Sequence, residues 1–157
     1  MTWERGRERV QQLIDNGELG QVPADINVAW RMLADAGRHL ATAATAESTG
    51  DLSGAYQLAY DALRKSAASL LAAQGLRPTS RGGHIAVQEA ATAQFGATVP
   101  VLRSFGRIRR ARNSFEYPSS ETPGPSVDDV KDAIRVAAEV RNAATTILEQ
   151  GVFTQWQ

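Results

Sequence analysis

Apolar residues recur along the chain at steps of three and four, which is the spacing of one face of an α-helix. The most regular stretch is residues 52–73, where small or apolar side chains occupy Leu52, Ala55, Tyr56, Ala59, Leu63, Ala67 and Leu70. This stretch stops at Gly75, a residue that suits the position just after a helix C-terminus. Alanine dominates the chain and β-branched runs are rare. The pattern therefore predicts an all-α fold.

About six helical segments follow from this pattern, and glycine or proline separates them. They cover approximately residues 2–16, 24–49, 52–73, 84–95, 98–115 and 126–149. The strongest break is "YPSSETPGP" at residues 117–125, after which Ser126 and Asp129 form a fair N-cap for the last segment. Long helices joined by short loops predict an up-and-down, antiparallel bundle of about five to six helices.

The length of 157 residues fits one compact domain. Within it we expect an N-terminal helical extension at residues 1–20, the helical bundle at residues 21–150 and a tail at residues 151–157. The tail either frays or docks onto the bundle through Phe153 and Trp156.

Charge and composition narrow the function classes without choosing one. Lys plus Arg and Asp plus Glu each number 17, so the net charge favours neither nucleic acid nor membrane as a partner. The chain has no cysteine, which excludes disulfides, thiolate metal sites and a cysteine nucleophile. The first residues lack the apolar run of a signal peptide, and no window is apolar enough to span a bilayer. With two histidines and no typical metal-ligand spacing, we expect a soluble, cytoplasmic protein without metal or cofactor.

The most pointed stretch is "FGRIRRARNSFEYPSSE", residues 105–121, because five arginines and no acid lie between Arg103 and Arg112. A helix over residues 99–115 would carry its apolar stripe at Leu102, Phe105, Ile108 and Phe115. Arg112 falls on or beside this stripe, and Arg109 and Glu116 flank it. A second row of arginines lies on the neighbouring face of this helix and comprises Arg103, Arg107 and Arg110.

Three interpretations of this arginine-rich stretch stay open. The first is a solvated helix end, where cations are favourable by roughly 0.3–1 kcal/mol each. The second is a structural salt bridge from Arg112 to Asp61 or Glu89, since a buried charge without a partner is costly. The third is a phosphate held at the mouth of a groove between helices, because a guanidinium matches the geometry of phosphate oxygens.

Four stretches in this order resemble the HEPN superfamily of small helical domains: "GDLSGAYQLAYDALRKSAASLLAAQGLRP", "GGHIAVQEA", "RIRRARNSFEYP" and "SVDDVKDAIRVAAEVRNAATTIL". The resemblance covers about residues 29–148. It implies an up-and-down helical bundle that usually dimerises. Many members of that family are metal-independent ribonucleases and toxins of toxin–antitoxin or antiviral systems.

The family motif is an arginine, four to six variable residues and a histidine, and it commonly begins with Arg-Asn. Arg112 and Asn113 resemble this start, yet residues 117–119 contain no histidine. An alternative register begins at Arg110, places Phe115 at the histidine position and matches Tyr117 to the tyrosine that sometimes follows. Because a phenol is a poor base near neutral pH, we do not expect ribonuclease activity by the usual family mechanism.

Both histidines and two tyrosines have a structural explanation beside a functional one. His84 follows two glycines near a helix start, so it is either a capping or surface residue or a substitute base. His39, beside Arg38 on a helix, reads as a surface or edge residue. Tyr56 and Tyr60 lie one turn apart, which favours core packing or a dimer face over base stacking.

The first hypothesis is a homodimeric module that binds RNA or a nucleotide, or regulates, without the usual catalytic histidine. Its phosphate contacts would come from Arg107, Arg109, Arg110, Arg112 and Asn113, and Tyr117 would help to shape the groove. The second hypothesis is a divergent ribonuclease toxin that uses Arg112 with Glu116 or Tyr117. The third is a component paired with a minimal nucleotidyltransferase as its antitoxin. In some such pairs the partner adenylylates the motif tyrosine, which Tyr117 resembles.

Overall fold

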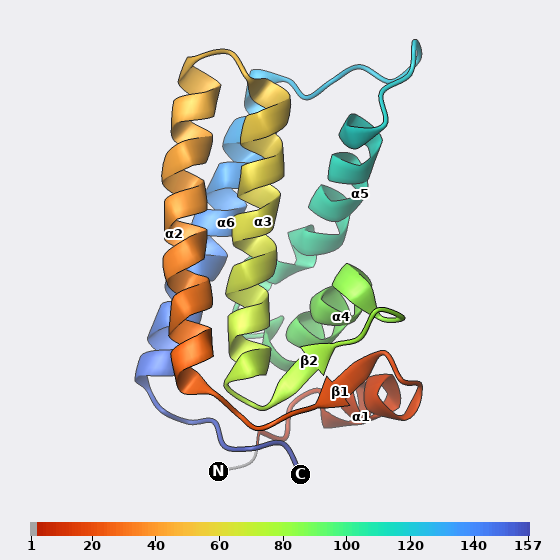
Figure 1. The fold of residues 1–157 in the computed structure, drawn as a ribbon, viewed down its shortest axis with the longest axis vertical. Coiled ribbons are helices and arrows are strands. Elements are labelled where there is room, and N and C mark those ends of the chain that lie inside the picture. The colour runs from red at the N-terminus through yellow and green to blue at the C-terminus, as the bar shows by residue number, and fades with distance from the viewer. Residues whose placement is uncertain (1–2) are drawn as a thin grey trace.

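The computed structural model describes residues 3–157 and is built almost entirely of helices (Figure 1). The helices are α1 (Arg7–Asp15), α2 (Ile26–Ser48), α3 (Leu52–Ala72), α4 (Gly83–Phe95), α5 (Phe105–Glu116) and α6 (Val127–Glu149), with a 3-10 helix, η1 (Pro100–Ser104), before α5. Two short strands, β1 (Leu19–Gln21) and β2 (Leu76–Pro78), form an antiparallel pair. The predicted all-α class is confirmed, and the small sheet is the one addition to it among the described residues.

Three long helices, α2, α3 and α6, pack against one another, and α6 lies behind α2 and α3 in the view of Figure 1. Side-chain caps fix where each of them begins. Asp25 accepts from the amides of Asn27 and Val28, and Asp51 accepts from the amide of Gly54. Ser126 and Asp129 form the reciprocal capping box that the sequence predicted for α6. The loop between α2 and α3 is short, so these two helices lie beside each other and run antiparallel.

Helix α3 is the central element because helices pack against it from several sides. It contacts the long helices α2 and α6 on one side, and α4 and α5 on the opposite side (Figure 1). Its buried residues accordingly run around most of the helix rather than along one stripe. Tyr60 is fully buried among them, so the prediction that it packs in the core is confirmed. The position of α3 brings its polar edge residues close to α4 and α5.

The predicted helix over residues 98–115 is divided in two. Pro100 begins η1, because its fixed backbone angle suits a first turn while it cannot donate a hydrogen bond. The α-helical hydrogen bonding of α5 starts only at Phe105. Leu102, Phe105 and Ile108 are nevertheless buried as the apolar stripe predicted. The 3-10 geometry of η1 does not change the side of the segment on which the arginines were expected to lie.

The base of the bundle is closed by the strands, by α1 and by the C-terminal tail (Figure 1). Of the two alternatives for the tail, fraying or docking, the structure has docking: Trp156 is buried, and Phe153 contacts the rings of Trp3 and Phe95. Deeper in the base, the side-chain amides of Gln74 and Gln94 hydrogen-bond to each other at 2.6 and 3.0 Å. Both amides are fully buried, so this reciprocal pairing satisfies groups that water cannot reach.

Within residues 3–157, no helix has both the length and the apolar character that crossing a bilayer would need.

Candidate anion-binding site

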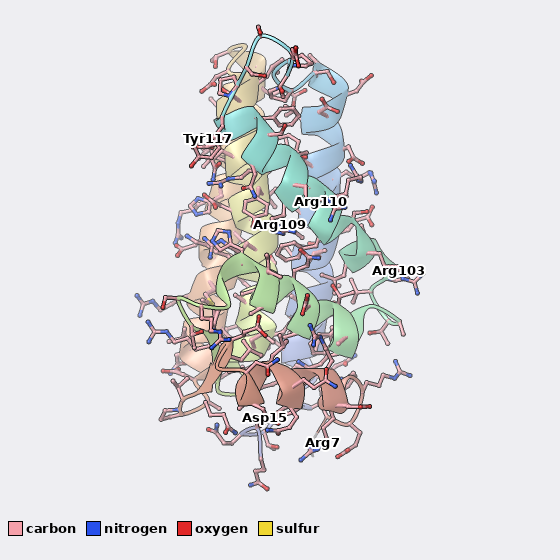
Figure 2. All side chains as sticks on the ribbon, turned by 90° about the vertical axis from the view of Figure 1, so that its right-hand side faces the viewer. Arg7, Asp15, Arg103, Arg109, Arg110 and Tyr117 are labelled. Atoms are coloured by element: carbon pink, nitrogen blue, oxygen red, sulfur yellow. The ribbon has the colours of Figure 1, made fainter. Side chains whose placement is uncertain are left out.

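The arginines of α5 fall into two sets that face different surroundings. Arg109 and Arg112 are partly buried toward α3 and α4, whereas Arg103, Arg107 and Arg110 are exposed. Figure 2 shows Arg109 where α5 approaches α4, and Arg103 and Arg110 nearer the outer edge. The two rows predicted from the helical spacing are therefore present. Arg109 and Arg112, which we call the inner row, approach polar side chains of α4 and α3.

Arg112 lies in the seam between α3 and α5. Its Nε donates to Oε1 of Gln57 at 2.7 Å, and one terminal nitrogen donates to Oδ1 of Asn113 at 3.1 Å. Its guanidinium carbon lies 5.6 Å from the ring centroid of Tyr60, within the range of a cation–π interaction. Glu116 approaches only to 4.0 Å from Nε and is itself about half exposed. Arg112 is thus oriented mainly by neutral groups.

The two acids suggested as salt-bridge partners of Arg112 pair elsewhere. Asp61 lies 3.7 Å from Arg64, one turn further along α3, and Glu89 pairs with Arg9 of α1. The structural salt bridge predicted as one alternative is therefore wrong for both named acids. The reason is geometric, since each acid has an arginine nearer to it along its own helix or across the α1–α4 contact.

Arg109 is held in a similar way. Its Nε donates to Oε1 of Gln88 on α4 at 2.9 Å. Gly106, one turn earlier on α5, leaves room for that glutamine, because a Cβ at position 106 would lie 2.7 Å from Nε2 of Gln88. Among residues 3–157, no carboxylate lies within 4.0 Å of a nitrogen of Arg109. Its positive charge is consequently not neutralised by direct pairing.

The structure also brings a histidine to these arginines. Nδ1 of His84, at the start of α4, lies 2.9 Å from the hydroxyl of Tyr60, and the two rings are 5.6 Å apart. Burial raises the pKa of Tyr60 to about 12, which outweighs the opposite effect of Arg64, Arg109 and Arg112. The phenol therefore stays protonated, and whether it donates to Nδ1 or accepts from Nδ1–H depends on the tautomer of His84.

The electrostatic surroundings of His84 are strongly positive. Partial burial lowers the pKa of His84, and Arg64 and Arg112 lower this pKa further, while Asp61 raises it. Arg109 adds a smaller effect in the same downward direction. Three guanidinium groups from two helices thus act on one imidazole. Nε of Arg64 is buried and has no hydrogen-bond partner among the described residues.

The remaining predicted residues lie around this centre. Arg107 donates to Asp132 of α6 at 2.8 Å, and that carboxylate also accepts from Arg135. Glu116 ends α5, and Tyr117 follows it with 79% of its surface exposed. The outer arginines and Tyr117 are thus on the surface, whereas Arg112 reaches the seam.

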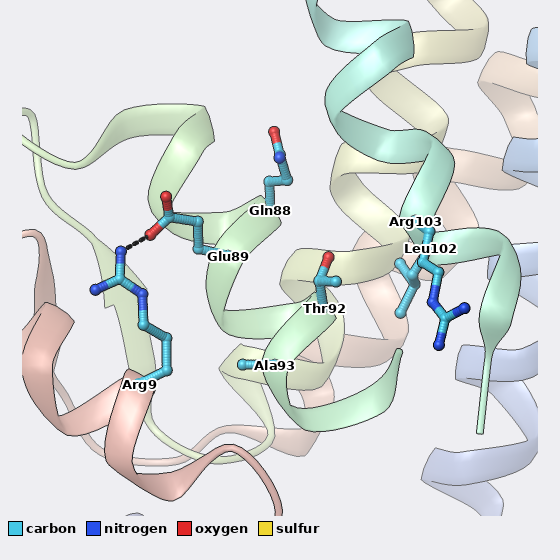
Figure 3. A pocket seen from close by; sticks show the side chains of 7 residues that line it. All are labelled: Arg9, Gln88, Glu89, Thr92, Ala93, Leu102 and Arg103. Carbon is cyan, nitrogen blue, oxygen red and sulfur yellow. Dashed lines mark hydrogen bonds and ion pairs between the residues drawn. The ribbon is translucent and has the colours of Figure 1, made fainter. Parts of the chain in front are cut away.

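Two hollows lie near these residues. One of about 20 Å³ is in the seam and is bordered by Gln57 and Arg112, a volume that holds no more than a single water molecule. The other, of about 250 Å³, lies between α1, α4 and η1 (Figure 3). Gln88 lines this larger pocket and also accepts from Arg109, so it connects the pocket with the arginines. The other residues around it are Arg9, Glu89, Thr92, Ala93, Leu102 and Arg103.

Sequence reasoning identified Arg109 and Arg112 but missed the residues that orient them. Gln57 and Gln88 carry no sequence signal, because a lone glutamine on a helix is ordinarily a surface residue. His84 was considered, and the glycines before it were the available signal. His39 lies apart from this centre, 2.8 Å from Nζ of Lys65. No cluster of acids and histidines within residues 3–157 could hold a metal ion.

Comparison with known proteins adds one finding. A family model described as the HEPN domain matches residues 29–148, which is more than half of the chain. No curated protein and no solved structure matches the chain significantly.

Proposed function

The chain belongs to the HEPN family, and from this premise we propose that it is a cytoplasmic, homodimeric module that binds RNA or a nucleotide. The observation that carries the proposal is the pairing of Arg109 and Arg112 with glutamine oxygens instead of carboxylates. A neutral acceptor fixes the direction of a guanidinium without cancelling its charge. The terminal nitrogens of such an arginine remain suited to phosphate oxygens.

The outer arginines extend the same electrostatic surface. Arg103 and Arg110 are exposed on the neighbouring face of α5, and Asn113 borders Arg112. A polynucleotide that lies along α5 would meet the inner row through direct hydrogen bonds and the outer row through longer-range attraction. The larger pocket beside Gln88 has room for one nucleoside next to a phosphate at Arg109.

The test is binding of a short single-stranded RNA to the wild-type chain and to the double variant Arg109→Ala, Arg112→Ala. We expect the variant to lose at least about tenfold in affinity and to show a shallower dependence on salt. Arg135→Ala is the matched control, because Arg135 is an exposed arginine held by Asp132 and Glu139. Equal affinities of the wild type and the double variant, insensitive to salt, would overturn the proposal.

The homodimer is tested separately. Sedimentation or light scattering over a wide concentration range should give twice the monomer mass of 16.9 kDa. A strictly monomeric chain at all concentrations would remove the dimer from the proposal and leave the binding site unchanged.

A second candidate function, a divergent ribonuclease toxin, is favoured by the position of His84. The imidazole would take the proton of a ribose 2′-hydroxyl, whose oxygen then bonds to the phosphorus while the bond to the 5′-oxygen breaks. Arg112 would stabilise the charge on the phosphate, and Glu116 in its carboxylic acid form, or the hydroxyl of Tyr117, would donate a proton to the leaving 5′-oxygen. Expression should then arrest growth and fragment RNA, and His84→Gln and Arg112→Ala should each slow cleavage by about 10²–10⁴-fold. Harmless expression argues against this candidate.

A third candidate is a partner of a minimal nucleotidyltransferase that adenylylates Tyr117. Tyr117 directly follows α5, and its exposure makes its hydroxyl accessible to another enzyme. Mass spectrometry after co-expression with such a transferase would show the added nucleotide on Tyr117. An unmodified Tyr117 peptide removes this candidate.

A further inference from the structure

The centre formed by Arg64, His84, Arg109 and Arg112 contains more positive charge than its own acids balance. Asp61 approaches Arg64 at 3.7 Å, and Glu116 approaches Arg112 only at 4.0 Å. These four cationic or basic residues come from three different helices, α3, α4 and α5. Because charges of the same sign repel, an anion bound among these groups would stabilise the arrangement.

The hydrogen-bond donors of the centre are only partly used. Arg109 donates through Nε and Arg112 through Nε and one terminal nitrogen, so these contacts leave three terminal nitrogens of this pair for a ligand. Nε of Arg64 has no partner within residues 3–157, but it is buried and so is not one of the donors that a ligand at the surface would meet. His84 uses Nδ1 toward Tyr60, which leaves Nε2 as its second bonding position. Helix α4 also begins without a side-chain cap, and its first amides add to the positive potential.

The number of donors indicates the kind of phosphate. An internal phosphodiester carries one negative charge and two free oxygens. A phosphate monoester carries close to two charges at pH 7 and three free oxygens. Three guanidinium groups and one imidazole in one place match the second ligand better than the first.

We infer that this centre, which we call the end-phosphate site (Arg64, His84, Arg109 and Arg112), selects a terminal phosphate monoester of the bound RNA or nucleotide. This inference rests on the proposed function, because it places the ligand at the same inner arginines of α5. Tyr60 orients the imidazole, and Gln57 and Gln88 orient the guanidinium groups of Arg112 and Arg109. The phosphate binds at the surface of the seam, because the hollow bordered by Arg112 holds no more than one water.

Proton uptake should accompany binding. Every charged group that acts on His84 from α3 and α5 is an arginine except Asp61, and these arginines disfavour the imidazolium in the free protein. A bound dianion compensates the arginines and so favours the imidazolium. The phosphate itself would release a proton in a cationic site, so net uptake identifies the histidine.

The experiment compares one single-stranded RNA octamer with a 5′-phosphate, with a 3′-phosphate and with hydroxyl groups at both ends. Isothermal titration in buffers of different ionisation enthalpy gives affinity and proton uptake together. We expect one phosphorylated end to raise affinity by at least about tenfold, the gain typical of charge-assisted hydrogen bonds. Arg64→Gln and His84→Gln should abolish this advantage, and His84→Gln should also abolish the proton uptake.

Two controls match these variants. Arg135→Gln removes an exposed arginine of α6, outside the seam, and His39→Gln removes the other histidine of the chain. Both should keep the end-phosphate advantage and the proton uptake. Circular dichroism of each variant verifies that the fold is retained.

The outcomes separate the two proposals. If all three octamers bind with equal affinity, the proposed function stands and the end-phosphate site is overturned. If no octamer binds, the RNA-binding part of the proposed function is overturned. Titration with inorganic phosphate then decides the site: binding with proton uptake that requires His84 supports it, and no binding overturns it.

Discussion

At the scale of single side chains, the acceptors of Arg109 and Arg112 decide whether these arginines keep their positive charge available to a ligand. A glutamine oxygen and a glutamate oxygen can occupy nearly the same place, but only the glutamate cancels the charge of a guanidinium. Gln57 and Gln88 therefore preserve the positive potential of the seam while they fix its geometry. This distinction separates an anion site from an internal salt bridge built from the same arginines.

The distinction can be tested by adding one carboxylate at a time. Gln57→Glu and Gln88→Glu should each keep the contact to the arginine and lower the affinity for RNA by about tenfold, because the new charge neutralises its partner. Thermal stability should be unchanged or slightly raised. Gln11→Glu on exposed α1 adds the same charge away from the seam and should leave RNA affinity within about twofold. Unaltered binding by the two seam variants would contradict the role given to the glutamines.

The pH dependence of stability follows from the lowered pKa of His84. The unfolded chain takes up a proton near the ordinary value of 6.5, whereas the native chain takes it up at lower pH. The free energy of unfolding should therefore fall as pH decreases from about 6.5 to the native pKa, and the loss should end below it. Urea unfolding of wild type and His84→Gln between pH 5 and 7.5 measures this: the variant should lack that part of the dependence. Parallel pH profiles of the two proteins would refute it.

At the scale of elements, local patterns were sufficient for the helices and insufficient for their contacts. The periodicity of residues 52–73 and the capping pair Ser126–Asp129 predicted α3 and the start of α6, because both signals lie within a few residues. The strands were missed, because β1 and β2 exist through pairing between Leu19–Gln21 and Leu76–Pro78. His84 was likewise not placed beside Tyr60, since 24 residues and a strand separate them in sequence.

The candidate site shows the same contrast between local patterns, which the sequence reveals, and contacts between helices, which it does not. The spacing along α5 placed Arg112 beside the apolar stripe, and this is where the structure has it. No periodicity within α5 could reveal that Gln88 of α4 and Gln57 of α3 would accept from its arginines. Those contacts depend on how three helices cross, which the sequence of one helix does not specify.

The docking of α1 onto α4 depends on one glycine. Gly6 has a φ of 69°, and a Cβ there would lie 2.5 Å from the backbone carbon and oxygen of Ala93. Gly6→Ala should therefore lower the free energy of unfolding by more than the roughly 1–2 kcal/mol that a left-handed backbone alone costs. Gly17→Ala is the matched control, because Gly17 has a φ of 73° and open space around it. Equal effects in denaturant unfolding would show that the close approach of α1 and α4 carries no cost.

For the whole molecule, the base is the part where distant segments meet. The backbone amide of Trp156 donates to the carbonyl of Gln74, and the side chain of Gln155 donates to Val22 and accepts from Ala24. Arg7 lies over the ring of Trp156 at 5.3 Å. The C-terminal tail thus joins α1, the α3–β2 turn and the start of α2 into one unit.

Removal of one tryptophan should show how much this unit contributes. Trp156→Ala should reduce the free energy of unfolding by about 3 kcal/mol, since the ring is 3% exposed and its loss leaves a cavity. Trp30→Ala, at a residue 37% exposed on α2, should cost less than about 1 kcal/mol. The two variants compare the same chemical change at a buried and an exposed place. Similar midpoints in urea would show that the tail does not stabilise the bundle.

The position of Trp3 and of the C-terminal tail at the base also has a practical consequence. Trp3, the first described residue, contacts Phe153 of the tail at one end of the molecule, and the loop after Tyr117 lies at the other end (Figure 1). A biotin tag or fluorescent fusion attached through a flexible linker at either end would leave the seam between α3 and α5 uncovered. Sensor surfaces and single-molecule tethers built this way would all present the protein in one orientation, with the arginines accessible to ligand from solution.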